Sequence, residues 1–290
     1  MRGDGVRNNK GNDHMTDQVT LRRRAMLAGG ALALGAGLPR AARADTVADI
    51  KKKGSVTIGI QGDNAPWGFV NTSGVVDGFD SDVGKLFAAF LGVKAEFSPL
   101  AVANRIPAWT TGRVDVLFAT MAMLPERAKA VQFSKPYVAN VISLVAPKAT
   151  AVKTNADMKA LVIGVPRSSA QDTQITRNAP EGTTIRRFDD DASTIQALLS
   201  GQVDAVGVNM FYVQRMEQSK PGIYENKLEF TRLYNGACTR LGDRELNAAV
   251  NAFIDQATAN GDLAKPYQKR MNMAPPSFPA SIEGIPFTAS

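Results

Sequence analysis

The chain has 290 residues, 44% of them hydrophobic, which is enough to bury a sizeable core and to form two compact lobes. Its formal charge of +7 is concentrated at one end, because residues 1–44 hold eight of the 34 basic side chains and only three of the 27 acidic ones. The remaining chain carries a net charge of +2, so its composition gives no support to nucleic-acid binding.

Histidine and cysteine are almost missing from the chain. His14 is the only histidine and Cys238 is the only cysteine. If the N-terminal segment is removed, no histidine remains, which excludes His-based triads, His-assisted acid–base catalysis and most zinc sites. A single cysteine excludes an intrachain disulfide. We therefore predict no catalytic residues, no metal and no cofactor.

The N-terminal segment has the pattern of a cleaved export signal of the twin-arginine type. Arg22–Arg24 precede a weakly apolar, Gly/Ala-rich stretch, Ala25–Leu38, and Ala42–Ala44 fit a small-x-small cleavage site. The alternative, an uncleaved membrane anchor, is disfavoured because the apolar stretch is short and interrupted by glycine. Met15 is a candidate for the true start besides Met1. The pattern predicts a periplasmic protein.

The chain then alternates strands and helices. Strands are predicted at Ser55–Ile60 and Val93–Phe97, and a turn-rich loop, Gly62–Trp67, follows the first of them. Between the strands, a helix is predicted from Asp80 to Gly92, because its apolar residues recur at helical spacing and a glycine stops it. A shorter helix runs from Asn104 to Gly112.

The next strand is the centre of the predicted site. Five of the six residues in Val114–Ala119 are apolar, which indicates a strand covered on both faces. Thr120, Ala122 and Arg127 follow its carboxyl end, where open α/β sheets bind their ligands. An arginine there offers a planar fork for a carboxylate or phosphate. The alternative is that Arg127 is a solvated helix residue beside Glu126.

A second block repeats this plan. Thr194–Asn209 match Arg105–Thr120 at a constant offset of 89 residues, and each is a helix, a glycine stop and a buried strand. This register places Thr120 and Asn209 at equivalent strand ends, so two facing α/β halves would bring both to one cleft. The alternative is that any helix–Gly–strand unit has this appearance.

The remaining elements connect the two halves and end the chain. A long apolar strand at Val138–Ala146 is predicted to be the first crossing between them. A return strand is predicted near Ala237–Leu241, followed by a helix from Asp243 to about Asn260 and a short helix starting at Gly261. The Pro-rich tail, Ala274–Ser290, is predicted to be packed loop or disorder.

Four segments carry a resemblance to a known family, and they are Gly74–Gly92, Asn104–Tyr137, Ile163–Thr173, and Gly201–Ala205 with Leu241–Tyr267. The second is the most specific, since a G-x-x-D strand is followed in register by E-R and F-S-x-P-Y. Through these segments most of Ile50–Lys269 resembles the family 3 extracellular solute-binding proteins, the periplasmic receptors of polar amino-acid ABC importers.

The resemblance implies an α/β fold of two lobes, the type II periplasmic binding protein fold, with two crossing strands as a hinge that closes on the ligand. The first lobe is expected to comprise residues 45–141 plus 236–290, and the second lobe residues 142–235. It also implies a small-molecule ligand, an ABC permease in the inner membrane as partner, and a monomer.

The resemblance assigns roles to three residues of the first lobe. In such proteins the arginine of the E-R pair binds the α-carboxylate of the ligand, which makes Arg127 the leading candidate. A hydroxyl seven positions earlier commonly assists, and here it is Thr120. Arg105 matches an arginine of relatives that bind acidic amino acids, where it meets the side-chain carboxylate. The alternative for Arg105 is a surface residue at the start of a helix.

Several positions depart from the family pattern. The aspartate that usually pairs with the ligand's α-ammonium is Asn209, which supplies no charge. Two expected hydroxyls are replaced by Ala122 and Ala170, although Ser169 precedes the latter. The aromatic lid is replaced by Asn64, and Trp67, three residues later, is either a ligand contact or part of the core.

With these departures, the arginines that would bind the carboxylate of the ligand remain, whereas the site for its ammonium group is weakened. The ligand is therefore either an acid without a primary α-amine or an ordinary amino acid held by Asn209 and an unrecognised acidic residue. We predict a periplasmic receptor that captures a polar or acidic amino acid, or a related carboxylate, for ABC-type import. The alternatives are an enzyme on the same fold, similar to cyclohexadienyl dehydratase, and a sensory receptor for a membrane kinase or chemoreceptor.

Overall fold

The computed structural model describes residues 46–290. The predicted export signal and both candidate start positions, Met1 and Met15, lie outside the described residues. Within residues 46–290 no helix is long and apolar enough to cross a membrane. In the same range no three His, Cys, Asp or Glu side chains are grouped so that they could hold a metal ion.

Eight strands form one mixed sheet in the order β5-β1-β6-β11-β7-β10-β8-β9. The first part of this sheet consists of β1 (Ser55–Gln61), which pairs in parallel with β5 (Lys94–Leu100) and β6 (Val116–Leu117). The three strands that follow β1 in the chain form a separate small antiparallel sheet, and they are β2 (Asp63–Asn64), β3 (Gly68–Val70) and β4 (Val76–Asp77).

Helices cover this part of the sheet. They are α1 (Thr46–Lys53), α2 (Phe79–Leu91), the 3-10 helix η1 (Val102–Asn104), α3 (Arg105–Thr110), α4 (Pro125–Ala128), α8 (Arg244–Ala259) and α9 (Ala264–Met271). The predicted helix before Gly92 is confirmed: Gly92 adopts a φ of 73°, and its N–H donates to the carbonyls of the last helical turn. Phe79, Phe87, Phe118 and Phe253 are among the aromatic side chains that build the core between these helices and the sheet.

The second part of the sheet consists of β10 (Ala205–Asn209), β8 (Val162–Pro166) and β9 (Thr184–Phe188), all parallel. Its helices are η2 (Asn155–Ala160, a 3-10 helix), α5 (Ala170–Asn178), α6 (Asp191–Leu199) and α7 (Tyr212–Glu217). Buried aliphatic side chains such as Val165, Ile175 and Val206 form two separate core clusters here. The two parts of the sheet therefore have their own cores, as expected for a two-lobed fold.

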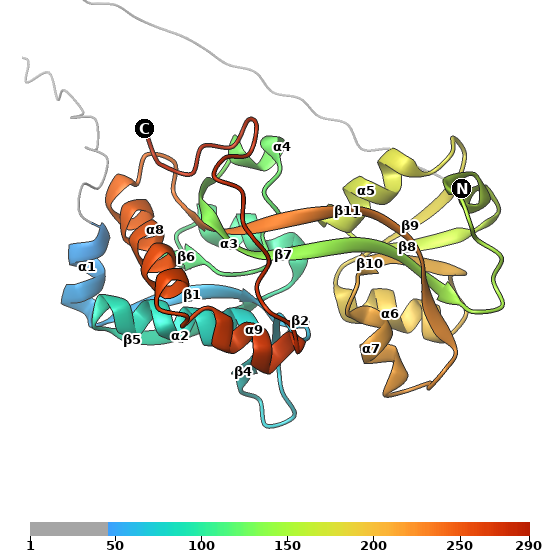
Figure 1. The fold of residues 1–290 in the computed structure, drawn as a ribbon, viewed down its shortest axis with the longest axis horizontal. Coiled ribbons are helices and arrows are strands. Elements are labelled where there is room, and N and C mark those ends of the chain that lie inside the picture. The colour runs from blue at the N-terminus through green and yellow to red at the C-terminus, as the bar shows by residue number, and fades with distance from the viewer. Residues whose placement is uncertain (1–45) are drawn as a thin grey trace, which may run out of the picture. The chain divides into compact units, whose positions relative to one another are not determined.

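Two long strands join the lobes. β7 (Gln132–Pro147) and β11 (Tyr224–Thr239) have 16 residues each and run side by side in antiparallel register (Figure 1). β7 pairs with β10 and β11 pairs with β6, so each lobe is attached to one crossing strand. The predicted lobe boundaries, at 141/142 and 235/236, fall inside these strands, and the second coincides with a register shift between Asn235 and Gly236.

The structure corrects two predicted boundaries and decides between the two alternatives for the C-terminal tail. The return strand begins at Tyr224 rather than near Ala237, because its first half alternates partly buried and exposed residues and carries no continuous apolar run. The regular part of the central strand is only Val116–Leu117, although nearly all of Val114–Ala119 is buried as predicted. The C-terminal tail is packed loop: Ile285 is buried, and the carbonyl of Pro286 accepts a hydrogen bond of 2.8 Å from the Gln132 side chain.

The predicted internal repeat is confirmed by two matching hydrogen-bond pairs. In the first lobe, the carboxylate of Asp115 accepts from the Thr57 N–H at 2.8 Å, while the Asp115 N–H donates to the Thr57 carbonyl at 2.8 Å. In the second lobe, Asp204 makes the same two bonds to Val162, each at 2.8 Å. The aspartate of each G-x-x-D segment thus fastens its strand to the neighbouring parallel strand.

Candidate functional site

A small cavity of about 10 Å³ lies where the two lobes and the crossing strands meet. A cavity of this size holds no more than about one water molecule. Its walls are formed by Gln61, Asn64, Val102, Arg105, Thr120, Ala122, Asn140, Ile142, Ala170, Gln171, Leu233 and Asn235. Five of the nine predicted binding residues, Asn64, Arg105, Thr120, Ala122 and Ala170, are among them. At this point the two lobes are in contact and leave no room for a ligand.

Arg105 is buried in the cleft, so the alternative of a surface residue at a helix start is wrong. The residue is 3% exposed, and backbone carbonyls fix its guanidinium: Nε donates to Val102 at 2.9 Å, and Nη1 donates to Ala119 at 2.8 Å and to Thr120 at 3.2 Å. Burial lowers the pKa of Arg105. Carbonyl dipoles hold the cation in place, but they do not neutralise its charge.

Arg127 is also buried, and it too lacks an acidic partner. Its Nη2 donates to the carbonyl of Ser168 in the second lobe at 3.0 Å, and Nη1 donates to that of Ala122 at 3.4 Å. Burial, and next the positive charge of Arg105, lower the pKa of Arg127 to about 9. No ion pair joins either arginine to an Asp or Glu among residues 46–290.

The two guanidinium groups also share a second cavity. This cavity has a volume of about 240 Å³ and is lined by Val102, Ala103, Arg105, Ile106, Pro107, Met121, Arg127 and Ser168. Two buried cations beside the same space repel each other, and an anion placed between them would relieve that repulsion. The arrangement is suited to a carboxylate.

Thr120 lies in the cleft with a left-handed backbone, at a φ of 51°. Its N–H donates to Asp80 Oδ2 at 3.0 Å, and its hydroxyl donates to Gln61 Oε1 at 2.9 Å. Asp80 itself is fully buried and accepts a hydrogen bond of 2.8 Å from the Tyr137 hydroxyl. Burial raises the pKa of Asp80 to about 7. A positive φ at a β-branched residue is unfavourable, so these contacts fix the turn that presents the hydroxyl.

Asn209 ends β10 and bonds across the cleft. Its amide group donates to Asn64 Oδ1 at 3.1 Å, and its side-chain oxygen accepts from the Phe211 N–H at 3.0 Å. Asn64 in turn donates to Gln61 Oε1 at 3.3 Å. The two strand ends that the repeat predicted to meet, at Thr120 and Asn209, are thus linked through Gln61 and Asn64.

Ser169 and Ala170 lie at the start of α5. The Ser169 hydroxyl accepts the N–H of Asp172 at 2.9 Å and caps the helix, while Ala170 faces the cavity. Trp67 does not line the cavity. It is fully buried in the core, where its ring meets Phe79 and Phe211 edge to face with centroids 6.0 and 5.4 Å apart. The predicted ligand contact of Trp67 is therefore without support, and packing explains the residue.

Sequence reasoning missed a set of contacts that join the lobes. Asp63 Oδ2 accepts the N–H groups of Asp191 at 2.7 Å and of Ala192 at 3.1 Å, at the N-terminus of α6. The Arg215 Nη2 donates to the Asp63 carbonyl at 2.9 Å, and Gln61 Nε2 donates to Asp191 Oδ2. One available signal was that Gln61 ends β1 and Asp63 closely follows it, at the same edge of the sheet where Thr120 follows β6.

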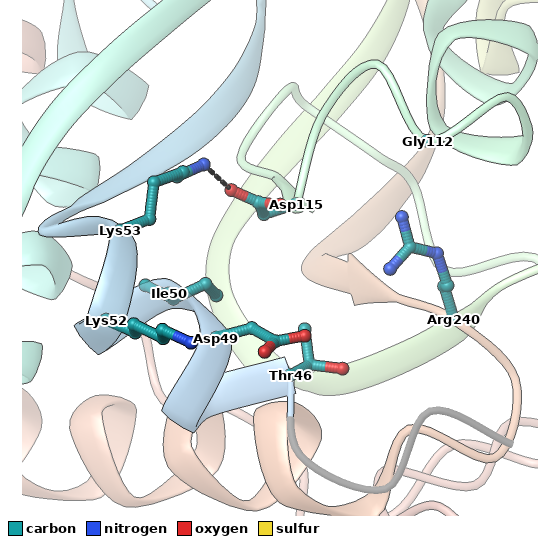
Figure 2. Close-up of a pocket in the computed structure, with 8 residues that line it drawn as sticks. All are labelled: Thr46, Asp49, Ile50, Lys52, Lys53, Gly112, Asp115 and Arg240. Carbon is teal, nitrogen blue, oxygen red and sulfur yellow. Dashed lines mark hydrogen bonds and ion pairs between the residues drawn. The ribbon is translucent and has the colours of Figure 1, made fainter.

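A larger cavity, of about 500 Å³, lies beside α1 and away from this cleft (Figure 2). Its walls include Lys52, Lys53, Asp115 and Arg240, and Lys53 pairs with Asp115 at 2.9 Å. None of the predicted site residues lines it. Asp115 and Lys53 have a structural explanation, because Asp115 already fastens the strands of the first lobe and Lys53 pairs with it, and the cleft remains the candidate site.

The fold and the cleft define a class of protein: a two-lobed receptor that encloses a small solute between its lobes. The chain belongs to the bacterial extracellular solute-binding proteins of family 3, whose model matches residues 56–273. This family membership was predicted from the four segments and is confirmed, as is the type II periplasmic binding protein fold.

Similar proteins include receptors for several amino acids. The L-cystine-binding protein of Escherichia coli K12 is 27% identical over 84% of this chain and 93% of its own length. The glutamine-binding protein of an ABC transporter in Bacillus subtilis 168 is 30% identical over 78% and 84%, respectively. The solved structure of the L-cysteine solute receptor of Neisseria gonorrhoeae is 29% identical, with a TM-score of 0.73 over 78% of this chain and 93% of that one.

Proposed function

We propose that this protein captures an amino acid in the periplasm, closes its lobes over it and delivers it to an ABC permease. The observation that carries the proposal is the pair of buried guanidinium groups, Arg105 and Arg127, neither of which forms an ion pair, in the cleft of a solute-binding fold. A buried cation without a counter-ion is costly, so the site is built for a ligand that brings a carboxylate. The similar receptors for cystine, glutamine and cysteine support an amino acid.

In this proposal Arg127 binds the ligand's α-carboxylate, and the Thr120 hydroxyl assists. Arg105 lies deeper, fixed by carbonyls, and meets a second acceptor group of the ligand. The cavity of about 240 Å³ beside the two arginines can take the carboxylate end of the ligand, but the cavity of about 10 Å³ between the lobes is too small for the rest of an amino acid. The lobes must first part about β7 and β11, bind, and close again.

The proposal is tested by replacing Arg127 with alanine and measuring ligand-induced stabilisation. The probes are L-glutamate, L-glutamine, L-cystine and L-arginine. Wild-type protein should be stabilised by at least one of them, and Arg127→Ala should lose about 100-fold or more in affinity for it, because a buried charge pair is truncated.

Arg113→Ala is the matched control, since it removes the same charge from an exposed side chain in the loop between α3 and β6, outside the cleft. It should bind as wild type does. Wild-type affinity in Arg127→Ala would contradict the assigned anchor. Similar melting temperatures of the two variants without ligand would show that the loss concerns binding and not folding.

We also infer a monomer without catalytic activity, exported by the twin-arginine route. The enzyme alternative needs a carboxylic acid in the cleft as general acid. Asp80 is a poor candidate because both of its oxygens already accept hydrogen bonds, and Asp191, the other buried acid nearby, lines neither cavity of the cleft. One solved structure at 29% identity and a TM-score of 0.70 is an ancestral amino-acid-binding protein described as a precursor of cyclohexadienyl dehydratase. Incubation with prephenate or arogenate tests the enzyme alternative, and product formation would contradict the inference.

A further inference from the structure

A buried carboxylate beside the cleft has no role in the proposed anion site. Asp191 is the first residue of α6 and is fully buried. Its Oδ2 accepts a hydrogen bond from Gln61, but its Oδ1 has no hydrogen-bond partner among the described residues. Leaving a buried carboxylate oxygen unbonded is costly, so such an oxygen indicates a missing donor.

This carboxylate forms no ion pair among the described residues. Asp63 on β2, Arg215 on α7 and Arg105 on α3 are the charged groups that act on it, one acidic and two basic. Neither arginine forms an ion pair with Asp191: Arg215 donates to the Asp63 carbonyl, and Arg105 is held by backbone carbonyls. Burial, followed by the negative charge of Asp63, raises the pKa of Asp191 to about 8.

The carboxylate is directly connected to the cavity wall. Gln61, which donates to Asp191, lines the cavity together with Arg105 and Thr120. Asn209, at the position where the family resemblance places the ammonium partner, is already engaged: its amide donates to Asn64 and its oxygen accepts from Phe211. The neutral amide therefore has little left to offer a ligand cation, whereas Asp191 has a free oxygen and, once ionised, the opposite charge.

We propose that Asp191, rather than Asn209, receives the α-ammonium group of the bound amino acid. This rests on the proposed function and narrows it, because it specifies a ligand with a cationic amine and excludes amine-free acids. A zwitterionic amino acid then places its carboxylate at Arg127 and its ammonium toward α6.

The test compares amino acids with amine-free analogues of the same shape. The calorimetric probes are L-glutamine with glutaramic acid, L-cysteine with 3-mercaptopropionic acid, and L-arginine with 5-guanidinopentanoic acid. Wild-type protein should prefer the amino acid of at least one pair. Asp191→Asn, which keeps the shape and removes the charge, should lose about 100-fold in affinity for that amino acid and change little toward its analogue.

Asp189→Asn is the matched control, because it makes the same change two residues away on an exposed side chain, and it should bind as wild type does. If Asp191→Asn kept the wild-type preference for the amino acid over its analogue, the inference would be overturned, but the role of Arg127 as carboxylate anchor would not be affected. Equal binding of each amino acid and its analogue by the wild type would also overturn the inference about Asp191. If wild-type protein bound none of the amino acids, the proposed function would fall, and this inference with it.

A second readout is independent of affinity. Pairing with an ammonium group favours the ionised carboxylate, so binding near pH 6.5 should release a proton from Asp191. Calorimetry in two buffers with different ionisation enthalpies measures this release. Wild type and Asp189→Asn should release about one proton per ligand, and Asp191→Asn clearly less. Equal proton release by all three proteins would overturn the inference, since Asp80 is unchanged in each of them.

Discussion

At the scale of single residues, the cleft is held by groups that are unfavourable on their own. Thr120 has a positive φ, Asp80 is a buried acid, and Arg105 is a buried cation. Each stabilises another, because Asp80 accepts the Thr120 N–H and Arg105 donates to the Thr120 carbonyl. Strain of this kind persists only where the surrounding structure fixes it, and it is typical of binding sites.

The two buried acids predict a particular dependence of stability on pH. Asp80 and Asp191 have folded-state pKa values of about 7 and about 8, against 3.8 as the ordinary value. Between pH 4 and 8 the folded protein therefore holds protons that the unfolded chain has released. The free energy of unfolding must fall as the pH rises through this range, by up to about 1.4 kcal/mol per pH unit for each group.

Urea denaturation of the ligand-free protein at pH 5, 6, 7 and 8 measures this slope. Asp191→Asn removes one of the two groups and should be less sensitive to pH, with its largest gain over wild type at pH 8. Asp77 and Asp82 do not interfere, because hydrogen bonds and ion pairs with Arg270 hold their pKa values below 3.8. Identical slopes for wild type and Asp191→Asn would mean that Asp191 is not a buried acid of raised pKa.

At the scale of elements, the repeat was the most informative feature of the sequence. Apolar runs and glycine stops predicted β1, α2 and α8, because these elements are determined by local periodicity and caps. The start of β11 was missed, since its exposed half alternates charged and apolar residues and is stabilised by pairing with β7. Strand pairing of this kind depends on a distant partner and leaves little local signal.

The repeat also predicts equal roles for Asp115 and Asp204. Each carboxylate accepts one backbone N–H of the neighbouring strand, so Asp115→Ala and Asp204→Ala should each lower the free energy of unfolding by about 1 kcal/mol. Because the two sites lie in different lobes, the double variant should lose the sum of the two effects. Chemical denaturation of the three variants checks this, and a strongly non-additive double variant would contradict the independence of the lobes.

At the scale of the whole molecule, the site could be predicted only in part. Arg127, Arg105, Thr120 and Asn209 were found because a family motif or the repeat marks them. Gln61, Asp63 and Asp191 were not, since they meet only when the lobes close, and no motif links a loop after β1 with the start of α6. Contacts between segments 128 or 130 residues apart are a property of the closed fold and not of either segment.

These contacts predict that the ligand-free protein is held closed by Asp63. Its carboxylate binds the first N–H groups of α6, where the helix dipole favours negative charge, and its carbonyl accepts from Arg215. Asp63→Ala removes the carboxylate and should shift the ligand-free population toward open forms, which small-angle X-ray scattering detects as a larger radius of gyration.

A saturating amino acid should return the Asp63→Ala variant to the wild-type radius, because the ligand then bridges the lobes in place of the lost contacts. Asp189→Ala is the matched control on the second lobe and should leave the radius unchanged, since its side chain pairs only with Arg167 at the surface. An unchanged radius of gyration in ligand-free Asp63→Ala would mean that other contacts hold the lobes together. The contact between Arg127 and the Ser168 carbonyl, which also joins the lobes, would then be the next to examine.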